Sequence, residues 1–185
     1  VSVGGARIVV ETRTYDGLGR CTERIDARKT KTEYAYDIFD RVVRSLETPS
    51  DGTPPRERLT TYALGTSEPM VRTLTVDSKL LGTREYDSLG RVISQARGNE
   101  TATTWEYKPN QVAPVAVTSP RGDRQEYGHD PELETLTSVK MAGHAPIDLE
   151  YDPISGAMRQ SLTAGLKHEM SYDENGYLAK EVQTL

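Results

Sequence analysis

A tyrosine followed by an aspartate returns along this chain at a nearly constant spacing. Tyr-Asp-Gly-Leu-Gly-Arg at residues 15–20 reappears as Tyr-Asp-Ser-Leu-Gly-Arg at residues 86–91. Successive repeat tyrosines lie 20 to 26 residues apart, and a fixed period in this range is the sequence signature of a repeat protein. The clear copies start at Tyr15, Tyr36, Tyr86, Tyr151 and Tyr172, and the weaker copies, which lack the Asp, at Tyr62, Tyr107 and Tyr127. The spacing therefore predicts a single array of about eight repeats over residues 1–185.

Each repeat has the pattern of a β-hairpin. Residues 31–36 (Lys-Thr-Glu-Tyr-Ala-Tyr) and residues 91–95 (Arg-Val-Ile-Ser-Gln) alternate along the chain with the period of two that is typical of strands. The Asp-x-x-Gly between such segments suits a type I turn, because Asp caps the turn and Gly accepts a left-handed backbone. Asp40 stands in the Gly position of the second repeat, and we expect it to adopt the left-handed conformation too. The predicted fold class is all-β, with tandem antiparallel hairpins.

The composition favours a thin, half-exposed sheet and excludes several classes of function. Hydrophobic residues make up 35% of the chain, and there are ten Tyr against one Phe and one Trp. The net charge of -5 provides no basic surface for nucleic acid. No apolar run approaches the roughly 18 residues of a membrane span. Cys21 is the single cysteine, so an internal disulfide and a Cys-based zinc site are excluded, and we expect no metal and no cofactor.

The repeated Tyr-Asp-x-x-Gly-Arg at about 22-residue spacing resembles the YD repeat of the RHS family. That family includes bacterial RHS and WapA-type polymorphic toxins, the B and C subunits of insecticidal Tc toxin complexes, and the teneurins. The resemblance covers residues 15–182. It implies that the hairpins form one long, curved antiparallel sheet, an arc of a spiral shell that in the toxins encloses a cytotoxic C-terminal domain.

The function implied by this resemblance is structural and non-enzymatic. The chain begins at Val1 without an initiator Met, so we expect a segment of a larger RHS protein, one that is secreted or on the cell surface of a bacterium. Its expected partners are the rest of the parent shell and the toxin cargo. Exposed strand edges at its two ends also predict self-association.

The residues expected to matter are those that build the repeat. They are Tyr15, Asp16, Gly19, Arg20, Tyr36, Asp37, Arg41, Tyr86, Asp87, Gly90, Arg91, Tyr151, Asp152, Gly156, Tyr172, Asp173 and Gly176. We expect Tyr to join neighbouring hairpins, Asp and Gly to form the turn, and Arg to pair with an acidic neighbour. Five Asp at one repeat position do not form the single unequal carboxylate pair that glycoside hydrolysis requires.

An alternative function is a cell-surface carbohydrate-binding or adhesion module built from the same repeat. Trp105 replaces a repeat Tyr and is the best candidate for stacking on a sugar ring. Arg121-Gly-Asp123 spells an adhesion tripeptide, but it lies where a turn between repeats is expected in any case. We expect no catalytic residues, since the chain contains no Gly-x-Ser-x-Gly nucleophile elbow and no Gly-rich phosphate loop.

Overall fold

The computed structural model describes residues 9–185, and the first eight residues of the predicted array lie outside them. The chain divides into two compact units, with the division between Glu100 and Thr101. All regular structure in the described part is antiparallel β-sheet, as the sequence predicts. The same residues contain no helix long and apolar enough to cross a membrane.

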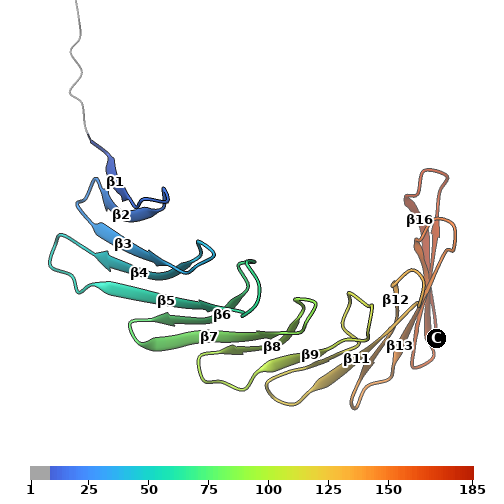
Figure 1. The fold of residues 1–185 in the computed structure, drawn as a ribbon. Helices are drawn as coiled ribbons and strands as arrows, with labels where there is room; N and C mark the ends of the chain where they lie inside the picture. Colours follow the sequence, from blue (N-terminus) through green and yellow to red (C-terminus); the bar gives the residue numbers. More distant parts are fainter. Residues whose placement is uncertain (1–8) are drawn as a thin grey trace, which may run out of the picture. The chain divides into compact units, whose positions relative to one another are not determined.

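The first unit, which we call unit 1, contains eight strands that lie side by side in chain order (Figure 1). Its four hairpins are β1–β2, β3–β4, β5–β6 and β7–β8, and each pair of neighbouring strands is antiparallel. The strands are β1 (Glu11–Tyr15), β2 (Cys21–Asp26), β3 (Lys31–Tyr36), β4 (Val42–Thr48), β5 (Arg56–Tyr62), β6 (Val71–Val76), β7 (Lys79–Tyr86) and β8 (Val92–Arg97).

The second unit, unit 2, repeats this arrangement with four further hairpins, β9–β10, β11–β12, β13–β14 and β15–β16. The strands are β9 (Thr103–Glu106), β10 (Ala116–Thr118), β11 (Arg124–His129), β12 (Leu136–Met141), β13 (Ile147–Tyr151), β14 (Met158–Thr163), β15 (Leu166–Tyr172) and β16 (Leu178–Thr184).

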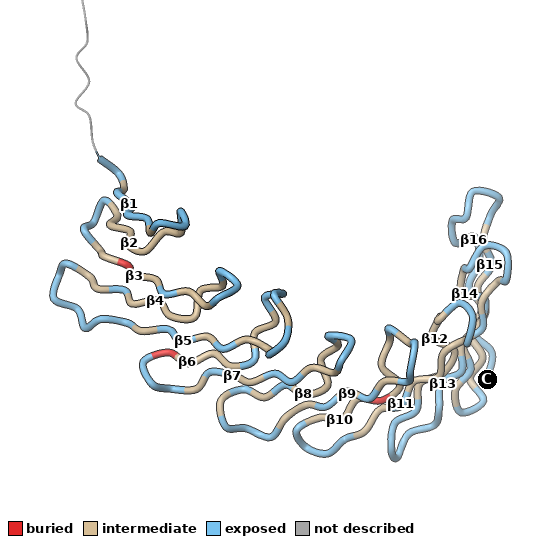
Figure 2. Tube along the Cα trace, viewed as in Figure 1, coloured by how far each residue is buried: buried red, intermediate tan, exposed pale blue. Residues whose placement is uncertain are grey.

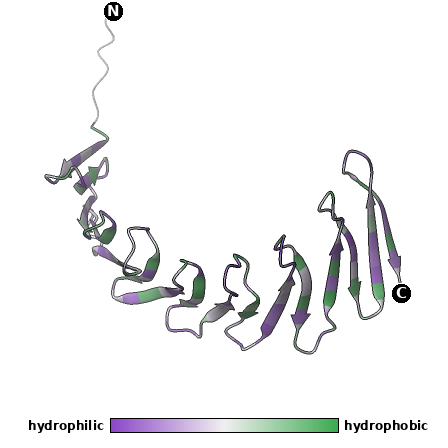
Figure 3. Cartoon of the chain, turned by 45° about the vertical axis from the view of Figure 1, so that its right-hand side comes forward, coloured by the Kyte–Doolittle hydropathy of each residue, from purple (hydrophilic) through white to green (hydrophobic). Residues whose placement is uncertain are grey.

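Neither unit has a conventional core. Val76 and Ala116 are the buried hydrophobic residues of the described chain, and Thr32 is its buried polar residue; Figure 2 shows these three as isolated points along the strands. Most other strand residues are half-buried or exposed, and hydrophobic and hydrophilic residues are interspersed along the strands (Figure 3). Stability must therefore come from contacts between adjacent hairpins within one layer of sheet.

The turns have the backbone conformation that the repeated Asp-x-x-Gly predicts. Gly19 and Gly90 lie in the left-handed region, with φ of 80° and 79°. Asp40 takes the same conformation with φ of 61°, so the prediction for this position is confirmed. In the hairpins of unit 1 the pairing register shifts at the repeat tyrosine, for example between Ala35 and Tyr36, as expected for a bulge that follows a tight turn.

The alignment of the sixth repeat on Tyr127 is wrong by two residues. In that hairpin the register shift falls between Gly128 and His129, and Asp130 caps the following turn. His129 therefore occupies the tyrosine position, and it lies 22 residues from both Tyr107 and Tyr151. Tyr127 matches the repeat because it has the expected residue type. The turn geometry instead places the repeat position directly before Asp130, at His129.

Candidate functional site

The recurring Asp organises each turn by accepting hydrogen bonds from the turn backbone. Asp16 Oδ1 accepts from the N–H of Leu18 at 2.9 Å and from the N–H of Arg20 at 3.0 Å. Asp37 and Asp87 accept from the equivalent two amides of their own turns. A carboxylate that satisfies two backbone donors replaces the hydrogen bonds that a tight turn otherwise leaves unmade.

The recurring Arg folds back onto the Asp of its own turn. The Nε–Oδ2 distances are 2.7 Å for Arg20 and Asp16, 2.7 Å for Arg41 and Asp37, and 2.6 Å for Arg91 and Asp87. The backbone and side-chain hydrogen bonds from Arg20 lower the pKa of Asp16. Partial burial acts to raise the pKa of Asp37 and of Asp87, but hydrogen bonds from the Arg and the turn amides lower it overall. These carboxyls are therefore held in the charged form.

The recurring Tyr joins one hairpin to the preceding one. The Tyr36 hydroxyl donates to the backbone carbonyl of Cys21 at 2.7 Å. The same bond links the following pairs of tyrosine hydroxyl and carbonyl: Tyr62 with Val42 (2.9 Å), Tyr86 with Val71 (2.9 Å) and, in unit 2, Tyr172 with Met158 (2.8 Å). Each acceptor is the first residue of the return strand of the preceding hairpin.

The Arg of one hairpin also covers the tyrosine ring of the next. The Arg20 guanidinium carbon lies 5.1 Å from the centre of the Tyr36 ring, and that of Arg41 lies 4.4 Å from the centre of the Tyr62 ring. Both distances are within the range of cation–π attraction. Tyr, Asp and Arg thus form one connected contact between successive hairpins, which we call the Tyr–Asp–Arg joint.

Arg41 makes contacts beyond its own Tyr–Asp–Arg joint. Besides Asp37 and Tyr62, it contacts the ring of Phe39 at 5.1 Å, and its Nη1 donates to the carbonyls of Thr66 and Glu68 at 2.8 and 2.9 Å. The last two residues belong to the long turn of residues 63–70, where the repeat has lost its Asp. A guanidinium from the preceding hairpin therefore supplies hydrogen bonds to a turn without that carboxylate.

Three turns of unit 2 keep the Asp cap, at Asp130, Asp152 and Asp173, and none of them has an Arg at the position of Arg20. Asp152 accepts from the amides of Ile154 and Ser155, and the one-residue-longer turn closes with the N–H of Gly156 bonded to the Asp152 carbonyl. Asp173 accepts from the amide of Tyr177, which occupies the Arg position. Gly156 and Gly176 lie at φ of 71° and 84°. Tyr151, at the end of β13, and Tyr172 are half-buried, whereas Tyr15, in the first hairpin, is exposed.

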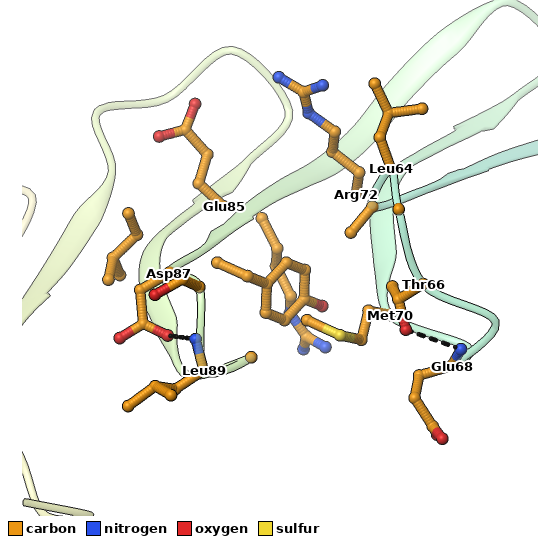
Figure 4. Close-up of a pocket in the computed structure, with 15 residues that line it drawn as sticks. Leu64, Thr66, Glu68, Met70, Arg72, Glu85, Asp87 and Leu89 are labelled. Carbon is orange, nitrogen blue, oxygen red and sulfur yellow. Dashed lines mark hydrogen bonds between the residues drawn. The ribbon is translucent and has the colours of Figure 1, made fainter. Parts of the chain in front are cut away.

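A shallow groove of about 620 Å³ lies between two neighbouring turns of unit 1, residues 63–70 and residues 87–90 (Figure 4). Its lining includes Met70 and Tyr86 together with charged side chains such as Glu85. Trp105 does not line this groove. It lies on β9 opposite Val117 and is half-buried. Among residues 9–185, no group of three His, Cys, Asp or Glu side chains is placed to hold a metal ion.

The acceptor carbonyls of the joint and the role of Arg41 were not predicted. Every residue carries a main-chain carbonyl. Recurring residue types in the sequence therefore do not identify Cys21 or Val42 as hydrogen-bond acceptors. Cys21 and Val42 each stand two residues after the last residue of the turn. This constant position is the signal that could have identified them.

The repeat itself is matched by a family model. Residues 15–54, which run from the end of β1 to the turn after β4, match the model of the RHS Repeat, and the predicted resemblance to the RHS/YD-repeat family is confirmed. No curated protein sequence matches the chain.

Solved structures with the same fold come from complexes titled TcdB2-TccC3. One of them superposes with a TM-score of 0.66 at 16% sequence identity, over 95% of this chain and 10% of that chain. A second, titled TcdB2-TccC3-Cdc42, superposes with a TM-score of 0.64 at 16% identity, over 94% of this chain and 10% of that chain. At this identity the likeness establishes the fold. The present chain spans about a tenth of the length of these chains.

Proposed function

We propose that this RHS-repeat chain is a structural segment of a protein shell, and that the shell encloses a C-terminal toxic cargo. The observation that carries the proposal is the contact between successive hairpins: the tyrosine–carbonyl hydrogen bond joins Tyr36, Tyr62, Tyr86 and Tyr172 to the hairpins before them, and the full Tyr–Asp–Arg joint is formed at Tyr36 and Tyr62. Such a joint stabilises a sheet one layer thick without a second layer to cover it. A wall needs a continuous, self-supporting layer, and the joint supplies one.

The role is non-enzymatic in this proposal, because the carboxylates of the repeat serve their own turns. Asp16, Asp37 and Asp87 are each occupied by two backbone amides and one guanidinium. A general acid or a nucleophile must instead present its carboxyl to a substrate.

The proposal includes partners and location. The chain would be one uninterrupted array of YD repeats within a larger RHS protein that is secreted or displayed on the cell surface. The first and last strands, β1 and β16, would continue the sheet into neighbouring repeats of the parent shell, and in isolation they would pair with another copy of the chain. The Tc complexes with the same fold support this placement by analogy.

The test is whether the wall protects the cargo in the full-length parent protein. Limited proteolysis should leave the C-terminal domain intact in the native parent and should degrade it once the joints are broken by the double variant Tyr36→Ala/Tyr62→Ala. Tyr177→Ala is the matched control, since Tyr177 is exposed and lies in a turn. Cleavage of the C-terminal domain at the same rate in the native parent as in the isolated domain would refute encapsulation.

The carbohydrate-binding alternative makes a different prediction at Trp105. Binding of a glycan array that Trp105→Ala abolishes, without a change in the unfolding midpoint, would favour an adhesion module over a wall. We favour the wall, because Trp105 is half-buried against its neighbouring strand.

A further inference from the structure

Every turn that follows a repeat-tyrosine position exposes at least one large apolar side chain, and the second turn exposes Phe39 (44%) besides Ile38. In unit 1 the most exposed of these residues are Leu18, Ile38, Leu64 and Leu89, with exposures between 66% and 90%. In unit 2 they are Val112, Leu133, Ile154 and Tyr177, with exposures between 69% and 95%. We call the four residues of unit 1 its apolar turn row. Leu64 and Leu89 lie on the two turns that flank the groove of Figure 4.

The turns at the opposite ends of the same strands lack this feature. Among the described residues in and beside the turns at those ends, the exposed large apolar side chains are Met141 (37%), Leu162 (39%), Ile147 (40%) and Leu81 (40%), far less exposed than the turn row. Val9, Val10 and Leu185 are highly exposed at the same ends, but they precede β1 or follow β16 and lie in no turn between strands. Turns normally carry Gly, Asn, Asp, Ser or Pro, and a highly exposed Leu or Ile adds little to the stability of its own hairpin. Its recurrence at one edge only is typical of a contact surface for another molecule.

The charged residues of the turns indicate what kind of molecule could bind the row. The four turns of unit 1 carry five acidic residues, Asp16, Asp37, Asp40, Glu68 and Asp87, against three arginines. Each arginine pairs with the Asp of its own turn, and Arg20 pairs with Asp40 as well. Five carboxylates against three guanidinium groups leave these turns with a net charge of -2. The corresponding turns of unit 2 carry six acidic residues, Asp130, Glu132, Glu134, Asp152, Asp173 and Glu174, against the single cation Lys108. A second copy of the same edge would bring like charges together, so the complementary partner is apolar and basic.

The row is carried by successive hairpins, and the spacing of hairpins in a sheet favours one conformation of the partner. Successive hairpins in a sheet are two strands apart, which is about 9.6 Å. A polyproline II helix has three residues per turn and advances about 9.3 Å per turn, so every third side chain falls on the same face. In a β-strand, residues three apart point to opposite faces. An α-helix advances about 10.5 Å over seven residues and loses register sooner.

We propose that the apolar turn row of unit 1 binds a proline-rich segment in the polyproline II conformation, with an apolar side chain at every third residue and basic residues between. The apolar side chains of the segment contact Leu18, Ile38, Leu64 and Leu89, and its cations face the acidic turns. The backbone amides of Leu18 and Leu89 donate to the Asp of their own turns, but the side chains of the row project into solvent. The proposal does not depend on the wall function.

The test measures binding of a fluorescent twelve-residue peptide with the repeat Leu-Pro-Arg to the whole chain by anisotropy. The control peptide has the same composition with the leucines gathered at one end. The quadruple variant Leu18→Ser/Ile38→Ser/Leu64→Ser/Leu89→Ser should weaken binding at least about tenfold, since each lost contact removes buried apolar area. Leu185→Ser is the matched control, because Leu185 is fully exposed and lies outside the turns. Raising the salt concentration should weaken the wild-type complex.

Three results would overturn the proposal. The two peptides could bind equally well, the quadruple variant could bind like the wild-type chain, or the chain could dimerise through the row. The third case would appear in sedimentation as a dimer that the quadruple variant dissociates, without any peptide binding. The substituted side chains are exposed, so circular dichroism should show an unchanged sheet and a retained unfolding midpoint for the variant.

Discussion

The hydroxyl of Tyr36 donates a 2.7 Å hydrogen bond to the carbonyl of Cys21, in the return strand of the preceding hairpin. This bond connects two residues 15 positions apart and leaves the side chain of Cys21 uninvolved. Together with the guanidinium of Arg20 over the ring, it fixes the distance between the two hairpins at the end of the strands that carries the repeated turns.

Removing this hydroxyl should loosen the wall at a single joint. Tyr36→Phe keeps the ring and its contact with Arg20 and loses one hydrogen bond, so we expect a loss of about 1 kcal/mol of unfolding free energy. Urea denaturation followed by circular dichroism measures it. Tyr86→Phe should have the same effect, because its hydroxyl makes the equivalent bond to Val71. Tyr177→Phe should leave the urea midpoint unchanged, since Tyr177 is exposed; equal losses in all three variants would contradict the joint.

Arg41→Lys should lower the local stability of the long turn of residues 63–70. Lysine retains the charge but lacks the planar fork that spans Asp37 and the carbonyls of Thr66 and Glu68. We expect amide hydrogen exchange in this turn, for example at Met70, to accelerate at least about tenfold, since bonds to charged groups are worth more than neutral ones. Arg20→Lys is the control and should leave residues 63–70 unaffected. Unchanged amide hydrogen exchange in Arg41→Lys would show that the turn is stable without the hydrogen bonds from Arg41.

The hairpins and their turns could be predicted because their determinants are local. Asp at the first turn position and a left-handed residue at the fourth define the turn within five residues, and even the exception at Asp40 follows from the tolerance of Asp for positive φ. The joint could be anticipated only in part. The role of Tyr was visible from its spacing, but the partner of its hydroxyl is a main-chain atom contributed by a different hairpin.

The apolar turn row could not be predicted from composition, because the sequence alone does not show whether a Leu or Ile side chain is exposed. Leu18 and Leu89 looked like ordinary variable positions of the turn, and only the fold shows that their side chains contact so little. The sixth repeat was misaligned for a related reason. His129 stands at the position set by the turn, whereas Tyr127 matches by residue type and donates its hydroxyl to the side chain of Gln125.

Two glycines of one turn should respond in opposite ways to the same substitution. Gly19→Ala places a Cβ on a residue with φ of 80° and should cost about 1 kcal/mol or more of unfolding free energy. Gly17→Ala should be neutral or slightly stabilising, because its φ is not in the left-handed region and a Cβ there meets no other atom within 4 Å. Urea midpoints of the two variants provide the comparison. A Cβ meets no atom within 4 Å at Gly19 either, so equal destabilisation of the two variants would contradict backbone conformation as the cause.

The repeat carboxylates should make the wall sensitive to acid. The backbone and side-chain hydrogen bonds from Arg20 lower the pKa of Asp16. For Asp87, partial burial acts to raise the pKa, but the hydrogen bonds from Arg91 and Leu89 outweigh it and lower the pKa. A carboxyl whose pKa is lower in the folded chain contributes its full stabilisation above the unfolded value of about 3.9 and loses it as the pH falls through the folded value.

The thermal unfolding midpoint should therefore change little from the contribution of these groups between about pH 7 and pH 5, and should fall steeply below about pH 4. Asp87→Asn should be less stable than the wild-type chain at pH 7, because it loses the ion pair with Arg91. Its midpoint should also decline less on acidification, because one titrating carboxylate is gone. If the variant and the wild-type chain show parallel acid profiles, the Asp–Arg pairs do not couple protonation to the stability of the wall.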